Sequence, residues 1–149
     1  DIFELTPAMK REHAQYWGRQ LGACWEDLVR GFLADASGRP VGPPIRDGNY
    51  ELCDFVVQGD AVDTKYRIGS GDSGTLRKFR RYGQRLSDRG LRPVMLLLRT
   101  DSLPAALRAC ERGGWTLLQG AEAFRYLEEL TGLDLRGWLR DRRGGWTIG

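Results

Sequence analysis

The chain has 149 residues, of which 41% are hydrophobic and 29% are charged, and its formal net charge is +3. These values predict a single globular domain, residues 1–149, with a core of its own, and they exclude an intrinsically disordered chain. No run approaches the roughly 20 apolar residues of a membrane span, and no signal-peptide pattern is found. The cysteines Cys24, Cys53 and Cys110 show no tight spacing, which favours reduced, buried thiols in a cytoplasmic protein.

The first predicted element is a long helix. Thr6 followed by Pro7 is a typical helix start, because threonine caps the first turn and proline fits its first position. Apolar residues recur at helical spacing from there, so the helix is predicted to end near Ala34. Gly22 and Glu26 lie four residues apart on one flank of this helix. A glycine there would let another backbone approach closely, and Glu26 would then face the same neighbour.

Two carboxylates and a lysine fall on a predicted β-hairpin that follows a loop rich in glycine and proline. Side chains alternate between faces along a strand, so Asp63 and Lys65 point the same way. A two-residue turn at 58–59 would set Asp54 opposite Asp63, on that same face. The other face is mostly apolar and is expected to be the buried side. The two strands are predicted at residues 50–57 and 60–67.

This arrangement favours a divalent metal site. Mg²⁺ prefers oxygen ligands and usually takes one or two carboxylates, with water and phosphate oxygens completing its shell. A nearby lysine can orient a water or neutralise developing charge. Two aspartates this close repel each other unless a cation accompanies them. The alternative is that Asp54 and Asp63 lie in solvent on an edge hairpin, with Lys65 paired to one of them.

Residues 69–74 match the pattern Gly-x-Gly-x-x-Gly. A dinucleotide-binding fold is disfavoured, because its first strand is buried on both faces and nearly all apolar, whereas the strand here carries Asp63, Lys65 and Arg67. Two alternatives stay open. The segment is either a flexible turn that ends in a helix N-cap at Ser73, or a loop whose amides contact a DNA backbone.

A basic amphipathic helix is predicted at residues 75–89. Leu76, Phe79 and Leu86 form its apolar stripe, and a basic stripe lies beside it. Contact with phosphates and a simply solvated face are both compatible with such a stripe. The basic residues are Arg77, Lys78, Arg81 and Arg85.

The second half of the chain alternates strands and helices. Residues 93–99 predict a central, strongly apolar strand, followed by a helix that Asp101 or Ser102 caps and that ends before Gly113 and Gly114. Residues 115–119 predict another strand. The full order predicts an α/β domain whose sheet is antiparallel at the hairpin and parallel after the basic helix. The last helices are predicted at residues 121–130 and 133–140.

The pattern Asp-x8-Asp-Thr-Lys, on a hairpin between a long helix and a basic helix, resembles the PD-(D/E)XK nuclease superfamily, which includes restriction endonucleases. The resemblance covers about residues 18–100. Residues 65–75 are similar to ApaLI-like restriction enzymes, while Cys53 stands where the pattern has proline. The resemblance implies a restriction-endonuclease-like, three-layer domain with a central mixed sheet flanked by helices.

The same resemblance implies a Mg²⁺-dependent DNA endonuclease of restriction type, with Mn²⁺ able to replace Mg²⁺ and DNA as the partner. Many relatives cut as dimers, so a homodimer is implied as well. Asp54 and Asp63 would bind the metal, Lys65 would position the attacking water, and Glu26 and the carbonyl of Thr64 would complete the metal shell. Backbone contacts to DNA would come from Arg67, Ser70, Ser73, Arg77, Lys78 and Arg81.

Several alternatives remain. Glu12 competes with Glu26, which could also be a solvated residue on a stripe with Arg19 and Arg30. The domain could bind nucleic acid without cleaving it, or act in DNA repair or processing, or serve as a protein-interaction module through Trp138 and Trp146.

The chain starts at Asp1 without methionine and is short for a whole restriction enzyme, which indicates a processed chain or a domain of a longer protein. A single histidine gives a zinc site or a Ser-His-Asp triad little support.

Overall fold

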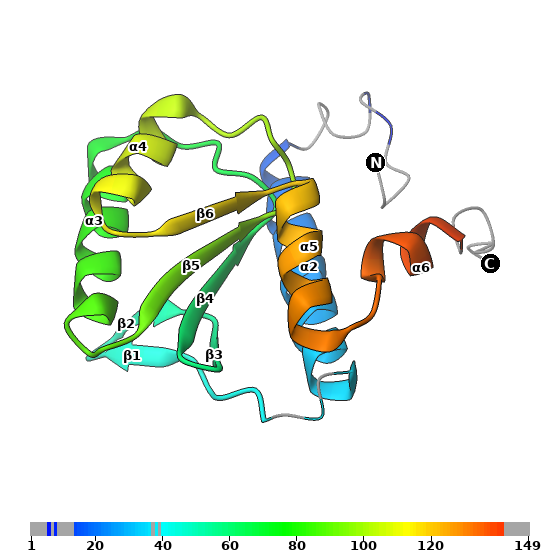
Figure 1. Ribbon diagram of the computed structural model, residues 1–149. Coiled ribbons are helices and arrows are strands. Elements are labelled where there is room, and N and C mark those ends of the chain that lie inside the picture. Colours follow the sequence, from blue (N-terminus) through cyan, green and yellow to red (C-terminus); the bar gives the residue numbers. More distant parts are fainter. Residues whose placement is uncertain (1–5, 7, 9–13, 37, 39, 142–149) are drawn as a thin grey trace.

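The computed structural model describes residues 6, 8, 14–36, 38 and 40–141. Three layers make up this part of the chain: a four-stranded sheet lies between helices α2 and α5 on one side and helices α3 and α4 on the other (Figure 1). The elements are α2 (Ala14–Ala36), β1 (Ile45–Asp47), β2 (Tyr50–Cys53), β3 (Phe55–Val57), β4 (Asp60–Lys65), α3 (Ser73–Ser87), β5 (Arg92–Leu97), α4 (Pro104–Arg112), β6 (Thr116–Gln119), α5 (Ala121–Thr131) and α6 (Leu135–Asp141).

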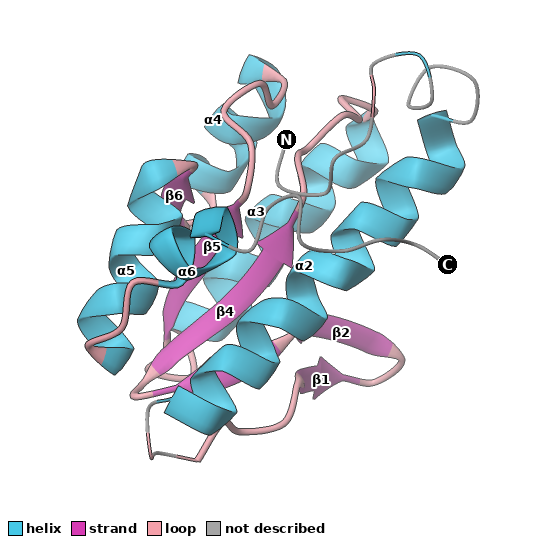
Figure 2. Cartoon of the chain, turned by 90° about the vertical axis from the view of Figure 1, so that its right-hand side faces the viewer, coloured by secondary structure: helices cyan, strands magenta, loops and turns pink. Residues whose placement is uncertain are grey.

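The sheet is mixed, as predicted. Its strand order is β3-β4-β5-β6, with β3 and β4 antiparallel and both later pairs parallel. β5 lies inside the sheet and is buried from Pro93 to Leu97, which is the pattern of a parallel strand covered on both faces. Figure 2 views the sheet from the side of α2 and α5, with the separate β1–β2 hairpin at one edge.

The predicted hairpin is confirmed at its turn and corrected in its first strand. Gln58 and Gly59 have φ values of 51° and 88°, the left-handed pair that suits a two-residue hairpin turn. The strand expected at residues 50–57 is divided at Asp54, because its first half pairs with β1 and only its second half pairs with β4. Asp54 therefore does not pair with Asp63 in the ladder, and the N–H of Asp54 donates to Val62 O instead.

Both faces of this hairpin are buried, in contrast to the single buried face that was expected. Phe55 and Val62 pack with α2 and α5, whereas Ala61 packs with α3 and α4. Cys53 was expected on the first of these sides and lies on the second. Helices cover the sheet on both sides, so the Asp63 side chain is only 14% exposed, whereas that of Lys65 is 37% exposed.

Helix α2 buries Leu21, Trp25, Val29 and Leu33, which recur every four residues along one face. The indole N–H of Trp25 donates to Leu96 O at 3.1 Å and joins the helix to the middle of the sheet. Cys24 lies on the outer face and is exposed, so the expectation that all three cysteines are buried is wrong for this one. The predicted helix start at Pro7 falls outside the described residues.

Two predicted helix caps differ from those observed. Asp72 and not Ser73 caps α3, because its carboxylate accepts from the N–H of Thr75 at 2.9 Å. Leu103 precedes α4 without a side-chain cap. The two side chains predicted as caps connect neighbouring loops instead. Ser102 accepts from the N–H of Ile68, and Asp101 pairs with Arg67 and Arg99.

Within the described part of the chain, no helix combines the length and the apolar character needed to cross a bilayer.

Candidate functional site

Asp54, Asp63 and Thr64, three of the four predicted metal-binding residues, lie where β4 extends past the end of β3. The ladder between these strands stops at Phe55 and Val62, so residues 63–65 pair only with β5 on their other side. Asp54 lies at the open edge that results. The site is therefore built at the carboxyl end of β4, in the gap left by a strand that ends early.

The carboxylate of Asp54 fills part of this gap. Its Oδ2 accepts from the backbone N–H of Thr64 at 2.6 Å and from the Thr64 hydroxyl at 2.8 Å. A strand N–H without a partner strand needs another acceptor when it is buried, and the carboxylate provides one. The backbone carbonyl of Asp54 also accepts from Arg30 Nη2 at 2.7 Å. Buried and bonded through both its side chain and its backbone, Asp54 has a fixed orientation.

Asp63 and Lys65 share a face, as the alternation of side chains predicted. They lie in register with Met95 and Leu97, which belong to the core under α3 and α4. The ammonium of Lys65 contacts the carboxylate of Asp63, and it donates to the carbonyl oxygen of Thr64 at 3.1 Å. The Lys65 ammonium is therefore bound by a carboxylate and a backbone carbonyl.

Electrostatic interactions connect the four predicted site residues. The pKa of Asp63 is raised to about 6, because burial and the charge of Asp54 together raise it by more than Lys65 lowers it. Burial also lowers the pKa of Lys65, but the charges of Asp63, Asp54 and Glu26 outweigh this and leave it raised. The pKa of Glu26 is raised by burial and then by Asp54. Burial first, and repulsion from Asp54 after it, therefore destabilise the ionised forms of Asp63 and Glu26.

Glu26 lies on the α2 side of the site and is paired with Arg30, one helical turn away, at 3.1 Å. Arg30 in turn binds the carbonyl of Asp54, so Glu26 is connected to the site through this arginine. Sequence reasoning missed the role of Arg30: its spacing from Glu26 indicates a helical ion pair, but nothing local indicates the bond to Asp54. A Cβ on Gly22 would meet nothing within 4 Å, so the close backbone approach predicted there is wrong. Glu12 falls outside the described residues.

Across the described ranges, no three side chains of His, Cys, Asp or Glu form a group arranged to hold a metal. An Asp63 carboxylate oxygen and the Thr64 carbonyl oxygen both face the Lys65 ammonium. Carboxylates and carbonyls are the hard oxygen donors that Mg²⁺ prefers. The donor set of Asp54, Asp63 and the Thr64 carbonyl therefore fits Mg²⁺ in its chemistry, provided that the Lys65 ammonium moves aside.

The residues predicted to contact DNA are all exposed, on the loop after β4 and on α3. Arg67 pairs with Asp101 at 3.0 Å, and Ser70 donates to Asp72. Lys78 lies 5.2 Å from the ring centroid of Tyr82, and its charge also lowers the pKa of Asp63. The basic side of α3 is therefore close enough to the acidic site to act on it electrostatically. The other exposed residues of this set are Ser73, Arg77 and Arg81.

No protein-family model matches the chain, and neither the curated proteins nor the solved structures contain a match. The function of the site therefore has to follow from its own residues.

Proposed function

We propose that this protein is a Mg²⁺-dependent DNA endonuclease that hydrolyses phosphodiester bonds, with a restriction-endonuclease-like fold. The observation that supports this most directly is the meeting of Asp63, Lys65 and the Thr64 carbonyl beside the fixed carboxylate of Asp54. The end of β4 supplies the ammonium, one acid and the backbone carbonyl, and Asp54, between β2 and β3, supplies the second acid of the Asp-x8-Asp-Thr-Lys pattern.

Each residue has a role that its surroundings support. Asp54 and Asp63 supply carboxylate oxygens, and the Thr64 carbonyl supplies a third ligand for the metal. When bound, Mg²⁺ supplies Lewis-acid polarisation of the phosphate and activation of water. Lys65 donates hydrogen bonds from an ammonium that stays charged, because the acids around it raise its pKa. Such a donor orients the attacking water or stabilises charge on the phosphate.

Glu26 acts from the opposite side of the site. It carries a raised pKa and feels the charges of both Asp54 and Lys65. Because Glu26 is paired with Arg30, it lies outside the set of residues that would contact the metal directly. The same arginine binds the backbone carbonyl of Asp54. We therefore assign Glu26 a supporting role in the metal shell, in which it balances charge and positions Asp54 through Arg30.

The DNA backbone would lie across the loop after β4 and the basic side of α3. Arg77, Lys78 and Arg81 project from successive turns of the helix that directly follows this loop, and all are exposed. Phosphate neutralisation by such residues gives sequence-independent affinity. A restriction role and a homodimer belong to the proposal through the resemblance of residues 65–75.

The test is a nicking assay on supercoiled plasmid with Mg²⁺ or Mn²⁺. Asp63→Asn and Lys65→Gln are expected to reduce the nicking rate at least about a hundredfold, because each removes a group that acts on the reacting phosphate. Glu129→Gln changes a comparable charge on the exposed surface of α5 and serves as the matched control. Both site variants should retain DNA binding, and cleavage at the parental rate by both would refute the proposal.

A non-cleaving nucleic-acid-binding domain is the second candidate, and one contact favours it. The Lys65 ammonium lies between the Asp63 carboxylate and the Thr64 carbonyl, the same two oxygens that a metal would use. An ion pair that never opens would stabilise the fold and exclude the metal. DNA binding that weakens steeply with salt, with no product under any divalent metal, would select this candidate.

A further inference from the structure

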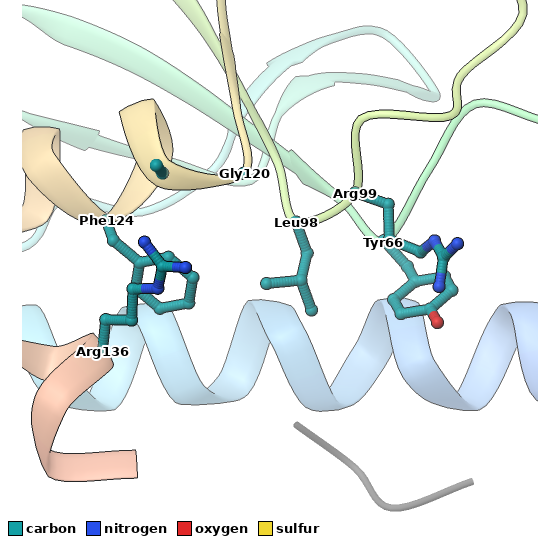
Figure 3. Close-up of a pocket in the computed structure, with 7 residues that line it drawn as sticks. Tyr66, Leu98, Arg99, Gly120, Phe124 and Arg136 are labelled. Carbon is teal, nitrogen blue, oxygen red and sulfur yellow. The ribbon is translucent and has the colours of Figure 1, made fainter. Parts of the chain in front are cut away.

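A hollow opens on the α2–α5 side of the sheet, at the same end of β4 as the acidic site. Its volume is about 210 Å³, and Tyr66, Leu98, Arg99, Phe124 and Arg136 are among the residues that line it. Figure 3 shows Arg136 and Phe124 at one end of the hollow, Tyr66 and Arg99 at the other, and Leu98 between them. Tyr66 directly follows Lys65, the last residue of β4, and its side chain lines this hollow.

The charge in this hollow is positive. Arg136 projects from α6, is exposed, and has no ion pair within residues 14–36 and 40–141. Arg99 is bound by Asp101 through two hydrogen bonds of 2.8 and 3.2 Å, and its guanidinium carbon lies 5.8 Å from the centroid of the Tyr66 ring. Asp101 therefore offsets part of the charge of Arg99, while its ion pair fixes the guanidinium at the wall of the hollow.

The start of α5 adds to this positive potential. The helix runs for 11 residues from Ala121, and Gly120 before it has no side chain to cap the first amides. Gly120 has a φ of 55°, a left-handed conformation that glycine adopts without strain. Glu122, the acid in this first turn, accepts from the N–H of Gln119 and lines a different hollow with Arg92 and Arg125. No acidic side chain is among the lining residues here.

The walls of the hollow are apolar and partly aromatic. Phe124 and Tyr66 are each largely buried, and Leu98 lies between them. Aromatic rings beside arginines are the combination that proteins use to stack nucleobases while the arginines bind the adjoining phosphate. A plain phosphate would leave these rings unused, and an uncharged aromatic compound would leave Arg136 unused. A nucleotide carries both an aromatic base and a phosphate, so it would contact both the rings and Arg136.

We propose that this hollow binds a nucleoside monophosphate unit, with the base against Tyr66 and Leu98 and the phosphate beside Phe124, between Arg136 and the start of α5. The unit can be a free nucleotide or a nucleotide of a DNA strand. The second source rests on the proposed nuclease function, since it would place a strand across the carboxyl end of β4 beside Lys65. The hollow would then be the subsite that binds one nucleotide next to the cleavage position.

The test is titration calorimetry in EDTA, so that binding is measured without cleavage. The probes are deoxyadenosine monophosphate, deoxyadenosine, and a short single-stranded oligonucleotide with or without a 5′-phosphate. The monophosphate should bind more tightly than the nucleoside. Arg136→Gln should weaken binding of the monophosphate about tenfold, as expected for one charge-assisted hydrogen bond. Arg140→Gln, on the same helix and outside the hollow, is the matched control and should bind like the parent.

Backbone amide shifts in a nuclear magnetic resonance titration with deoxyadenosine monophosphate provide the second measurement. The largest shifts should fall on Gly120, Ala121 and Phe124. Equal affinity for nucleotide and nucleoside, equal loss in both arginine variants, or shifts confined to α3 would overturn the proposal. If the free nucleotide binds and the oligonucleotides do not, the source is a free nucleotide. The nicking assay decides the nuclease function separately, so the failure of one proposal can be told from the failure of the other.

Discussion

Asp54 binds Thr64 twice through a single carboxylate oxygen, at 2.6 Å to the backbone nitrogen and at 2.8 Å to the hydroxyl. The two residues are ten positions apart: Asp54 directly precedes β3, Thr64 lies on β4, and the ladder between these strands ends before it reaches either. Their two hydrogen bonds take the place of the backbone hydrogen bonds that a longer β3 would make to β4. Asp63 and Lys65, the neighbours of Thr64 on β4, point to the other face of the strand from the Thr64 side chain, and the charge of Asp54 still acts on both.

Thr64→Val should destabilise the protein by about 2 kcal/mol, because it removes a hydroxyl that donates to a buried carboxylate. Thr64→Ser retains the hydroxyl and loses only a methyl group, so it serves as the matched control. Urea unfolding of both variants gives the comparison, with the slope of the transition checked for two-state behaviour. If Thr64→Val were as stable as Thr64→Ser, the hydroxyl bond would contribute nothing to stability.

Asp63→Asn should become more stable relative to the parent as the pH rises from about 4 to about 6. The folded pKa of Asp63 is about 6 and its ordinary value is 3.8, so in this range the folded parent binds more protons than the unfolded chain. The parent therefore loses stability as the pH rises, by at most about 3 kcal/mol, whereas asparagine does not titrate. Denaturant unfolding of both proteins across this range measures the difference. A constant difference from pH 4 to pH 8 would show that the carboxyl has an ordinary pKa.

Mg²⁺ should raise the melting temperature of the parent more at pH 8 than at pH 5. At pH 5 most Asp63 carboxyls are protonated and cannot bind a cation, whereas at pH 8 they are ionised. Asp63→Asn should lose this dependence on pH and most of the stabilisation. Differential scanning fluorimetry at matched ionic strength, with NaCl replacing MgCl₂, separates specific binding from screening. Equal shifts for the parent and the variant would place the bound Mg²⁺ elsewhere.

Gly83→Ala should destabilise the protein by about 3 kcal/mol or more, because α3 and α4 approach each other closely at this residue. An added Cβ would lie 2.2 Å from the backbone oxygen of Gly113 and 2.6 Å from the indole nitrogen of Trp115. That indole donates to Phe79 O at 2.8 Å, so it has little freedom to move. Thermal and urea unfolding measure the loss.

Gly18→Ala is the control for this substitution. Gly18 also lies within a helix, but a Cβ there would meet nothing within 4 Å. Alanine should stabilise α2 by about 0.5–1 kcal/mol at this position, since it limits the unfolded chain and favours the helix. Similar losses in both variants would mean that helix propensity, and not the close approach of α3 and α4, governs the effect.

The sequence by itself determined the alternation of helices and strands apart from the division at Asp54, the mixed sheet, the two-residue turn and the shared face of Asp63 and Lys65. These features depend on local periodicity and on the strict alternation of side chains, and both can be read from neighbouring residues. Only the tertiary structure decided that β2 and β3 separate at Asp54, that Arg30 binds the Asp54 carbonyl, that Ser102 supports Ile68, and that helices cover both faces of the hairpin. Phe124 and Arg136 likewise join Tyr66 from distant parts of the chain. Contacts of this kind depend on which strand ends first and which helix packs across it, and no local pattern encodes that choice.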